Sequence, residues 1–298
     1  METFKSGFVS IIGKTNVGKS TMLNSIIGTQ VAITTSKPQT TRTAIKGIVN
    51  RKNSQIVFID TPGIHKAKSK FGEAMTNIAY EALGEVDVIL FLIEATYTHI
   101  GTADKIILEK LKEKNKKVIL VINKIDLVPK ENLLKLIELY RNEYNFKAIV
   151  PISALKNKEI ETLLIEIEEL LPVGPAYYNI DEYTDQTERQ IVEEIVREKC
   201  LKLLNDEIPH GIYVKVEKMK LRKTKNGEDI YDVDIIIYCM KNSHKGIIIG
   251  KDGNMLKKIA SYSRQKIEKI LDIKLNMNIW VKVQEDWQNR DNIIKNIC

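Results

Sequence analysis

The chain has 298 residues, of which 43% are hydrophobic and 29% charged, and its formal net charge is +7 at pH 7. This length allows two domains, and the composition is that of a globular protein; its longest nearly apolar run, residues 86–93, is too short to cross a bilayer. The first twelve residues lack the pattern of a secretory signal, and Cys200, Cys239 and Cys298 form no CxxC pair, which argues against a disulfide framework or a zinc site. We therefore expect a cytosolic protein.

Residues 1–171 alternate short apolar runs with helical stretches. The runs are FVSII, QIVFID, VDVILFLIEA, KVILVIN and AIVPIS. Such nearly continuous apolar runs, separated by helices, are typical of parallel strands buried on both faces. AIKGIVN, residues 44–50, and QIVFID are joined by a short polar turn, which predicts an antiparallel hairpin at one edge. We predict a doubly wound α/β domain over residues 1–171.

The first apolar run is followed by GKTNVGKS, residues 13–20, and then by a helix. In a phosphate-binding loop, glycines let backbone N–H groups close around phosphate oxygens, a lysine neutralises the outer phosphates and a hydroxyl binds Mg²⁺. The motif assigns the last two roles to Lys19 and Ser20. Its strand-loop-helix context favours this interpretation over a chance match in a glycine-bearing turn.

The polar loop SKPQTTR, residues 36–42, precedes the sequence DTPG, which ends the run QIVFID. A threonine of the loop can complete the Mg²⁺ shell when a γ-phosphate is present; we favour Thr41, with Thr40 as the alternative. Asp60 can hold Mg²⁺ through water, and Gly63 can bring its N–H to the terminal phosphate. A plain surface loop rich in threonine remains the other interpretation of residues 36–42.

NKID, residues 123–126, ends the run KVILVIN. The carboxylate of Asp126 can accept hydrogen bonds from both N1–H and the exocyclic amine of guanine, a pair of donors that adenine lacks. SAL, residues 153–155, follows the last apolar run and can offer the N–H of Ala154 to guanine O6. The predicted base is guanine. The complete predicted nucleotide-binding set is Gly13, Asn16, Val17, Gly18, Lys19, Ser20, Thr21, Asp60, Gly63, Asn123, Lys124, Asp126, Ser153 and Ala154, with Ser20, Thr41 and Asp60 as metal ligands.

Residues 172–187 contain two prolines, a glycine and several polar residues, and we predict a linker there. A second domain over residues 188–298 follows, with the predicted element order αββααβ. Between residues 241 and 283, ten lysines or arginines face three acidic residues, so this segment has an excess charge of 10 − 3 = +7. A basic segment indicates nucleic acid, or else a solvated lysine-rich surface.

IIIGKDGNMLKKIA, residues 247–260, joins a short predicted helix to a long one through a GxxG loop. The glycines permit close passage of a nucleic-acid backbone, and lysines can meet phosphates. A bare helix-to-helix turn is the alternative, but the αββααβ order favours a type II KH domain that binds single-stranded RNA. Trp280 is expected in the core. The predicted RNA-binding residues are Ile247, Ile248, Ile249, Gly250, Lys251, Gly253, Lys257 and Lys258.

The four ordered motifs are similar to those of the translation-factor class of GTPases, which have Ras-like domains. QTTR and the asparagine of GKTNVGKS resemble the Era family, as do the linker LPVGPAYYNIDEYTDQTERQ and the stretches NDEIPHG, HKGIIIGKDG and IWVKV, so the resemblance covers essentially the whole chain. The departures are Asn179, where a proline is usual, and CMKNSHK, residues 239–245, where a Glu-Arg pair is usual.

This resemblance implies a slow, Mg²⁺-dependent GTPase that binds GTP and GDP, binds the 3′ end of small-subunit rRNA and assists small-subunit assembly. It also implies a monomer that is cytoplasmic and peripherally associated with the inner membrane. The alternative is a signalling GTPase whose basic domain binds a protein or an anionic membrane surface. A ribosome factor with two GTPase domains is excluded because the motif series occurs once.

Ile64 occupies the position at which Ras-like proteins have the glutamine that orients the attacking water. The predicted catalytic groups are therefore Asn16, Lys19, Thr41 and Gly63. The amide oxygen of Asn16 can coordinate a monovalent cation beside the β and γ phosphates, and GTPases that resemble this chain often use K⁺ there. Alternatively, Asn16 only braces the loop.

Overall fold

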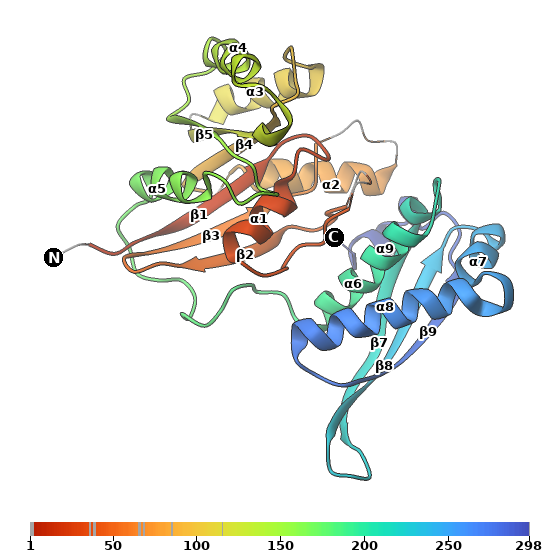
Figure 1. Cartoon of the computed structure of the whole chain (residues 1–298). Coiled ribbons are helices and arrows are strands. Elements are labelled where there is room, and N and C mark those ends of the chain that lie inside the picture. Colours follow the sequence, from red (N-terminus) through yellow and green to blue (C-terminus); the bar gives the residue numbers. More distant parts are fainter. Residues whose placement is uncertain are drawn as a thin grey trace. The chain divides into compact units, whose positions relative to one another are not determined.

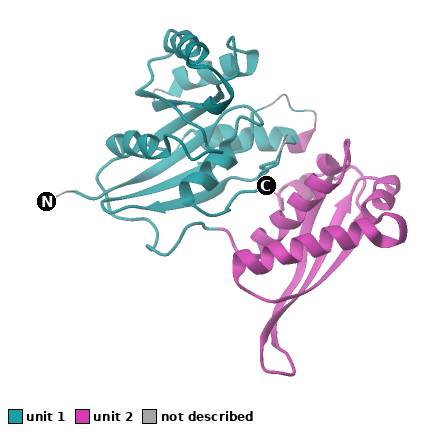
Figure 2. Ribbon diagram, in the orientation of Figure 1, with its two compact units in different colours: residues 1–68, 72–185 teal, residues 69–71, 186–298 magenta. Residues whose placement is uncertain are grey.

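A computed structural model describes residues 3–35, 37, 40–64, 67, 69–84, 86–114 and 116–297 of the chain. The chain divides into two compact units (Figure 2): residues 1–68 with 72–185, and residues 69–71 with 186–298. Among the described residues, no helix is both long enough and apolar enough to cross a membrane. Cys200 and Cys239 are buried free thiols, and Cys298 lies outside the described residues.

The first unit is built on a six-stranded sheet of order β2-β3-β1-β4-β5-β6. Only β2 is antiparallel to its neighbour, as the hairpin prediction required; the other adjacent pairs are parallel. The doubly wound fold predicted from the apolar runs is confirmed. Its strands are β1 (Lys5–Ile12), β2 (Ile45–Asn50), β3 (Ser54–Asp60), β4 (Val88–Glu94), β5 (Lys117–Asn123) and β6 (Ala148–Pro151).

Helices cover both faces of this sheet (Figure 1). Helices α1 and α5 pack on one face through residues such as Leu23 and Leu163, and α3 and α4 pack on the other through Leu108 and Tyr140. Burial on both faces explains why β4 and β5 are nearly continuous apolar runs. The helices are α1 (Lys19–Ile27), α2 (Lys70–Glu81), α3 (Thr102–Lys114), α4 (Lys130–Arg141) and α5 (Ile160–Leu170), with a 3-10 turn η1 at Ile125–Leu127.

Most of the segment predicted as a linker, residues 172–187, lies against the first unit. The Gln55 side chain accepts hydrogen bonds from the N–H groups of Tyr177 and Tyr178 at 2.7 and 3.0 Å. The N–H of Ile48 in β2 donates to the carbonyl of Tyr183 at 2.9 Å. Edge strand β2 is therefore partly covered by the chain that leaves the domain, which limits its exposure to other strands.

The second unit contains a three-stranded sheet of order β7-β8-β9, with β7 antiparallel and β9 parallel to β8. The order α6, β7, β8, α7, α8, β9 confirms the αββααβ prediction, and a short helix α9 follows it. The bounds are α6 (Glu188–Leu203), β7 (Ile212–Lys223), β8 (Asp229–Cys239), α7 (Asn242–Ile249), α8 (Asn254–Leu271), β9 (Leu275–Val283) and α9 (Asp291–Ile294), with 3-10 turns η2 (Ile208–Gly211), η3 (Lys251–Gly253) and η4 (Trp287–Asn289).

The two tryptophans of the second unit lie in opposite environments. Trp287 is fully buried, and its Nε1 donates to the carbonyl of Gly211 at 2.9 Å. Trp280 is 48% exposed, so the expectation that it belongs to the core is wrong. Because side chains alternate along β9, Val281 faces the core and its neighbour Trp280 lies on the opposite face of the sheet.

Candidate functional site

The loop 13–20 connects β1 to α1 and has a backbone that only glycine accommodates at two points. At Gly13, with φ +153°, an added Cβ would lie 2.3 Å from the carbonyl oxygen of Leu92. At Gly18, with φ +101°, it would lie 2.3 Å from the amide nitrogen of Asn123. These close approaches form a tight loop whose N–H groups lie at the start of a helix, the arrangement that binds phosphate in other proteins.

Lys19 lies at the start of α1 with its side chain buried. Its ammonium donates to the carbonyls of Gly13 at 3.2 Å and Lys14 at 3.0 Å. Burial lowers the pKa of Lys19 to about 8, and the nearby charge of Asp60 opposes this shift. The ammonium is therefore held by neutral carbonyls inside the loop, where phosphate oxygens would be stronger partners.

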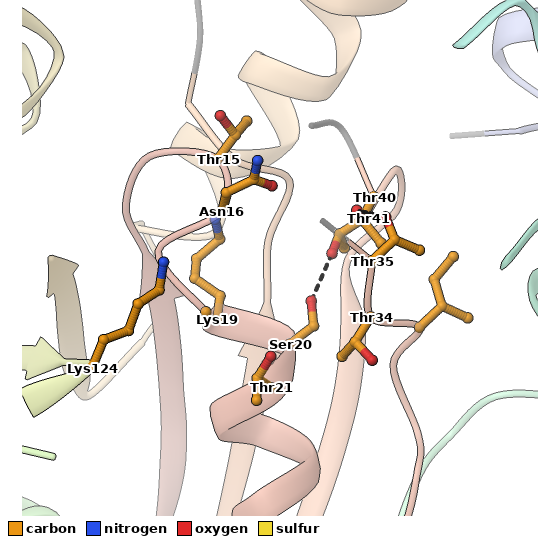
Figure 3. A pocket seen from close by; sticks show the side chains of 13 residues that line it. Thr15, Asn16, Lys19, Ser20, Thr21, Thr34, Thr35, Thr40, Thr41 and Lys124 are labelled. Carbon is orange, nitrogen blue, oxygen red and sulfur yellow. Dashed lines mark hydrogen bonds between the residues drawn. The ribbon is translucent and has the colours of Figure 1, made fainter. Parts of the chain in front are cut away.

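A cavity of about 370 Å³ opens beside this loop (Figure 3). Threonine and lysine side chains supply most of its polar groups. It is lined by Thr15, Asn16, Gly18, Lys19, Ser20, Thr21, Ile33, Thr34, Thr35, Thr40, Thr41, Gly63 and Lys124. The structure thus brings the loop, parts of residues 33–41, Gly63 of the DTPG motif and Lys124 of the NKID motif to one cavity.

The three predicted metal ligands contact one another, and two of them, Ser20 and Thr41, line this cavity. Ser20 Oγ donates to Asp60 Oδ2 at 2.6 Å and lies 2.9 Å from Thr41 Oγ1, which is itself 3.3 Å from Asp60 Oδ2. Asp60 Oδ1 is buried and has no hydrogen-bond partner among the described residues. Burial raises the pKa of Asp60, and the charge of Lys19 opposes this. An unpartnered carboxylate oxygen beside two hydroxyls suits a hard cation such as Mg²⁺.

Thr40 and Thr41 have different partners, although both line the cavity. Thr40 Oγ1 lies 2.9 Å from Thr35 Oγ1 and donates to the carbonyl of Lys37 at 2.7 Å, within its own loop. Thr41 instead meets Ser20 and Asp60. The geometry favours Thr41 over Thr40 as the metal ligand. Ser36, Pro38 and Gln39 of the same predicted loop lie outside the described residues.

The segment after Asp60 runs directly against the phosphate loop. A Cβ at Gly63 would lie 2.8 Å from the Cα of Thr15, so only glycine permits this approach. The N–H of Ile64 donates to the carbonyl of Gly13 at 3.2 Å, and the Ile64 side chain is 6% exposed within the core. Ile64 therefore packs in the protein interior, and His65 lies outside the described residues.

The predicted guanine-binding residues form a connected set at the ends of β5 and β6. Asn123 Nδ2 donates to the carbonyl of Val17 at 2.9 Å and so ties this set to the phosphate loop. Ser153 Oγ donates to Asp126 Oδ1 at 2.5 Å, which lowers the pKa of the Asp126 carboxyl. The N–H of Ala154, predicted to donate to guanine, donates here to Asn123 Oδ1 at 3.0 Å.

Glu94 is part of this site and was missed by the sequence analysis. Its Oε2 lies 2.7 Å from Lys124 Nζ, and its Oε1 accepts from Thr96 Oγ1 at 2.7 Å. Glu94 ends β4 directly beside Asn123, which ends β5. Ligands of open α/β sheets bind at the carboxyl ends of strands, and this rule, applied to the run VDVILFLIEA, would have found it.

The GxxG loop of the second unit is a separate feature with its own backbone requirement. Gly250 and Gly253 both have φ +73°, and a Cβ at Gly250 would lie 2.8 Å from the Cβ of Met255. Asp252, between them, also has a left-handed φ of 54°. Lys251 of this loop is exposed, as are Lys257 and Lys258 in the first turns of α8.

The three isoleucines before this loop differ in exposure. Ile247 is 51% exposed and Ile249 is half-buried, whereas Ile248 is fully buried in the core of the second unit. Ile248, one of the predicted RNA-binding residues, therefore packs against the core and offers no exposed side-chain surface to RNA. The reason is the helix itself, since consecutive residues of α7 point in directions about 100° apart.

The fold and the site define the class of this protein as a P-loop GTPase domain joined to a KH domain. The family described as 50S ribosome-binding GTPase matches residues 8–124, and the family described as KH domain matches residues 207–288. The chain is similar to GTPase Era of Ruminiclostridium cellulolyticum, with 50% identity over 99% of this chain and 97% of that protein. GTPase Era of Clostridioides difficile is also 50% identical, over 98% of each chain.

Two solved structures are similar along the whole chain. One is Era in complex with MgGDPNP and nucleotides 1506–1542 of 16S ribosomal RNA, with a TM-score of 0.94, 40% identity and coverage of 99% of this chain and 98% of that one. The other is a variant of Aquifex aeolicus Era bound to GDP and aluminium fluoride, with a TM-score of 0.94, 39% identity and coverage of 99% of both chains. The chain belongs to the Era family and is a GTPase that uses GTP, GDP and Mg²⁺.

Proposed function

We propose that this GTPase binds the 3′ end region of small-subunit rRNA through residues of its KH domain and assists assembly of the small ribosomal subunit. The observation that carries the proposal is the combination of the polar cavity at loop 13–20 with the left-handed, lysine-flanked GxxG loop in one chain. The relative crystallised with this RNA and MgGDPNP supports the choice of ligand.

Within the nucleotide site, we assign roles by geometry. Ser20 and Thr41 would hold Mg²⁺, with Asp60 beside them, and the ion would supply charge stabilisation to the phosphates. Lys19 would neutralise the outer phosphates, and Gly63 would donate its N–H to the terminal one. Ile64 is apolar and buried, so its side chain cannot orient water, and a slow intrinsic rate is expected.

The proposed location is the cytoplasm, with a peripheral association with the inner membrane and a monomeric state. This part of the proposal follows the family resemblance. The alternative, a signalling GTPase whose basic domain binds a protein or an anionic surface, predicts that vesicles rich in anionic lipid compete for the same lysines as RNA. In our proposal, the RNA fragment binds in the absence of any lipid.

One titration tests the rRNA proposal. A labelled single-stranded fragment of the rRNA 3′ end is titrated with the full chain bound to a GTP analogue, bound to GDP, or free of nucleotide. We expect the GTP-analogue form to bind about tenfold more tightly than the GDP form, a ratio within the usual range of coupling between two sites. A fragment of the same length and shuffled sequence is the control. Equal binding of both fragments would contradict the proposed target.

A second experiment tests the role of Asn16. Its φ of 66° holds it in a left-handed conformation at the cavity, where its amide oxygen could coordinate a cation beside the β and γ phosphates. We expect K⁺ to accelerate GTP hydrolysis roughly tenfold over Na⁺ at equal ionic strength, which corresponds to a change of about 1.4 kcal/mol in the barrier. Rates are measured with saturating Mg²⁺.

In the same assay, Asn16→Ala should abolish the difference between K⁺ and Na⁺, and Ile64→Ala should retain measurable activity. Ile64→Ala is the comparison because it changes an apolar side chain whose backbone is bridged to Lys14 of the same loop, without removing a cation ligand. Equal rates in the two salts for the parent chain would eliminate the cation and indicate that RNA or the ribosome supplies the activating group.

A further inference from the structure

Lys14 is the phosphate-loop residue whose side chain extends to another helix. Its ammonium lies 2.6 Å from Asp104 Oδ2, in the first turn of α3. The Asp104 side chain is 1% exposed, whereas that of Lys14 is 24% exposed. A buried carboxylate is costly unless it is paired, so this ion pair is a strong constraint on where the loop lies relative to α3.

The surroundings of the pair restrict Lys14 to this position. Tyr140 Oη donates to Asp104 Oδ2 at 3.1 Å, and Lys14 Nζ lies 4.5 Å from the centre of the Tyr97 ring. A Cβ at Gly101 would lie 2.7 Å from Lys14 Nζ, so the absence of a side chain there leaves room for the ammonium. Burial, followed by the charge of Asp104, raises the pKa of Tyr97 to about 12.

The backbone carbonyls of Gly13 and Lys14 contact Lys19 and the segment that follows Asp60. The carbonyls of Gly13 and Lys14 accept from the Lys19 ammonium, and the carbonyl of Gly13 also accepts from the N–H of Ile64. Lys14 and Ile64 form a parallel β-bridge, which places Gly63 against the loop. A shift of the Lys14 backbone would therefore move Gly63, whereas Lys19 would keep the carbonyl of Gly13 as a partner.

We propose that Asp104 is a positioning residue for GTP hydrolysis, which acts by holding Lys14 and, through its backbone, the placement of Gly63. The inference rests on the GTPase activity and on the proposed contact of Gly63 with the terminal phosphate. GDP lacks that phosphate. Loss of the ion pair between Lys14 and Asp104 should therefore slow hydrolysis much more than it weakens GDP binding.

The test is a double-mutant cycle on the single-turnover rate of GTP hydrolysis in the full chain, at saturating GTP and Mg²⁺. Asp104→Asn and Lys14→Met should each slow hydrolysis about tenfold, since sub-ångström misplacement is sufficient for a loss of that size. Because the two residues act as one unit, the double variant should also be about tenfold slower, not about a hundredfold. GDP affinity should change less than about threefold in each variant.

Two further variants separate positioning from general stability. Lys14→Arg retains a cation for Asp104 and should keep the rate within about twofold of the parent. Asp87→Asn is the matched control at the other end of the sheet, where Asp87 Oδ2 accepts from the N–H of Phe8 at 2.8 Å. It should lower the melting temperature without slowing hydrolysis. Should Asp104→Asn fail to fold, Lys14→Met still removes the ion pair, and it does so at a partly exposed side chain.

Three outcomes would overturn the proposal. The first is a Lys14→Met variant that hydrolyses GTP at the parental rate. The second is multiplicative losses in the double variant, because these would show that the two residues act independently. The third is a fall in GDP affinity as large as the fall in rate, since it would assign the pair to nucleotide binding as a whole.

Discussion

Replacing Asp126 by asparagine should weaken GTP binding by about a thousandfold, a loss of roughly 4 kcal/mol. The Asp126 carboxylate offers two acceptors, and the hydrogen bond from Ser153 favours its charged form by lowering its pKa. An asparagine presents one acceptor and one donor, so its NH₂ group would face a donor of guanine. Because Asp126 is exposed before nucleotide binds, we expect less than the largest discrimination known for enclosed hydrogen-bonding pockets.

Xanthosine triphosphate tests the same contact by changing the base in place of the protein residue. Its carbonyl at position 2 accepts where guanine donates, so Asp126→Asn should bind it more tightly than the parent does. Affinities of both nucleotides are measured by competition with a labelled GDP. Asp181→Asn, which alters an exposed carboxylate of the same unit outside the cavity, should leave both unchanged. If Asp126→Asn bound GTP as tightly as the parent chain does, the NKID motif would not be the part that recognises guanine.

The nucleotide cavity could be predicted from the sequence because its groups follow strand ends. In a parallel sheet the carboxyl ends meet at one edge, so loop 13–20, Asp60 and Asn123 had to converge once the strands were recognised. The choice between Thr40 and Thr41 could not be made in this way. Adjacent hydroxyls in an irregular loop have no periodicity, and only the three-dimensional path shows that Thr41 meets Asp60.

The sequence analysis missed two acidic residues because each of them acts through a lysine. Asp104 and Glu94 contact the site through the lysines they hold, and their partners Lys14 and Lys124 are distant in sequence. An acidic residue in the first turn of a helix is ordinary, so the pairing of Asp104 with Lys14 cannot be seen without the fold. Glu94 differs, because its position at the end of β4 could have indicated a place in the site. Trp280 was expected in the core, but alternation along β9 places it on the face away from the core.

RNA binding by the second unit should fall steeply with salt. If Lys251, Lys257 and Lys258 each neutralise one phosphate of a single strand, the slope of log affinity against log salt is about −2, and affinity falls about twentyfold between 50 and 200 mM. Changing all three lysines to glutamine should reduce affinity about a hundredfold at low salt and flatten the slope, because the released counterions are lost with the charges. GTP affinity should stay parental, since the cavity is lined by residues of the first unit.

The control must remove the same net charge elsewhere. Lys112, Lys130 and Lys135 are exposed lysines of helices α3 and α4 in the first unit, and their change to glutamine lowers the net charge by the same amount. If long-range attraction alone held the RNA, both triple variants would lose affinity equally. Binding confined to the GxxG loop and the start of α8 predicts that only the second-unit variant does. If the RNA affinity of the full chain did not change with salt concentration, these lysines would not be binding phosphates. A contact between charges in water must weaken as counterions accumulate.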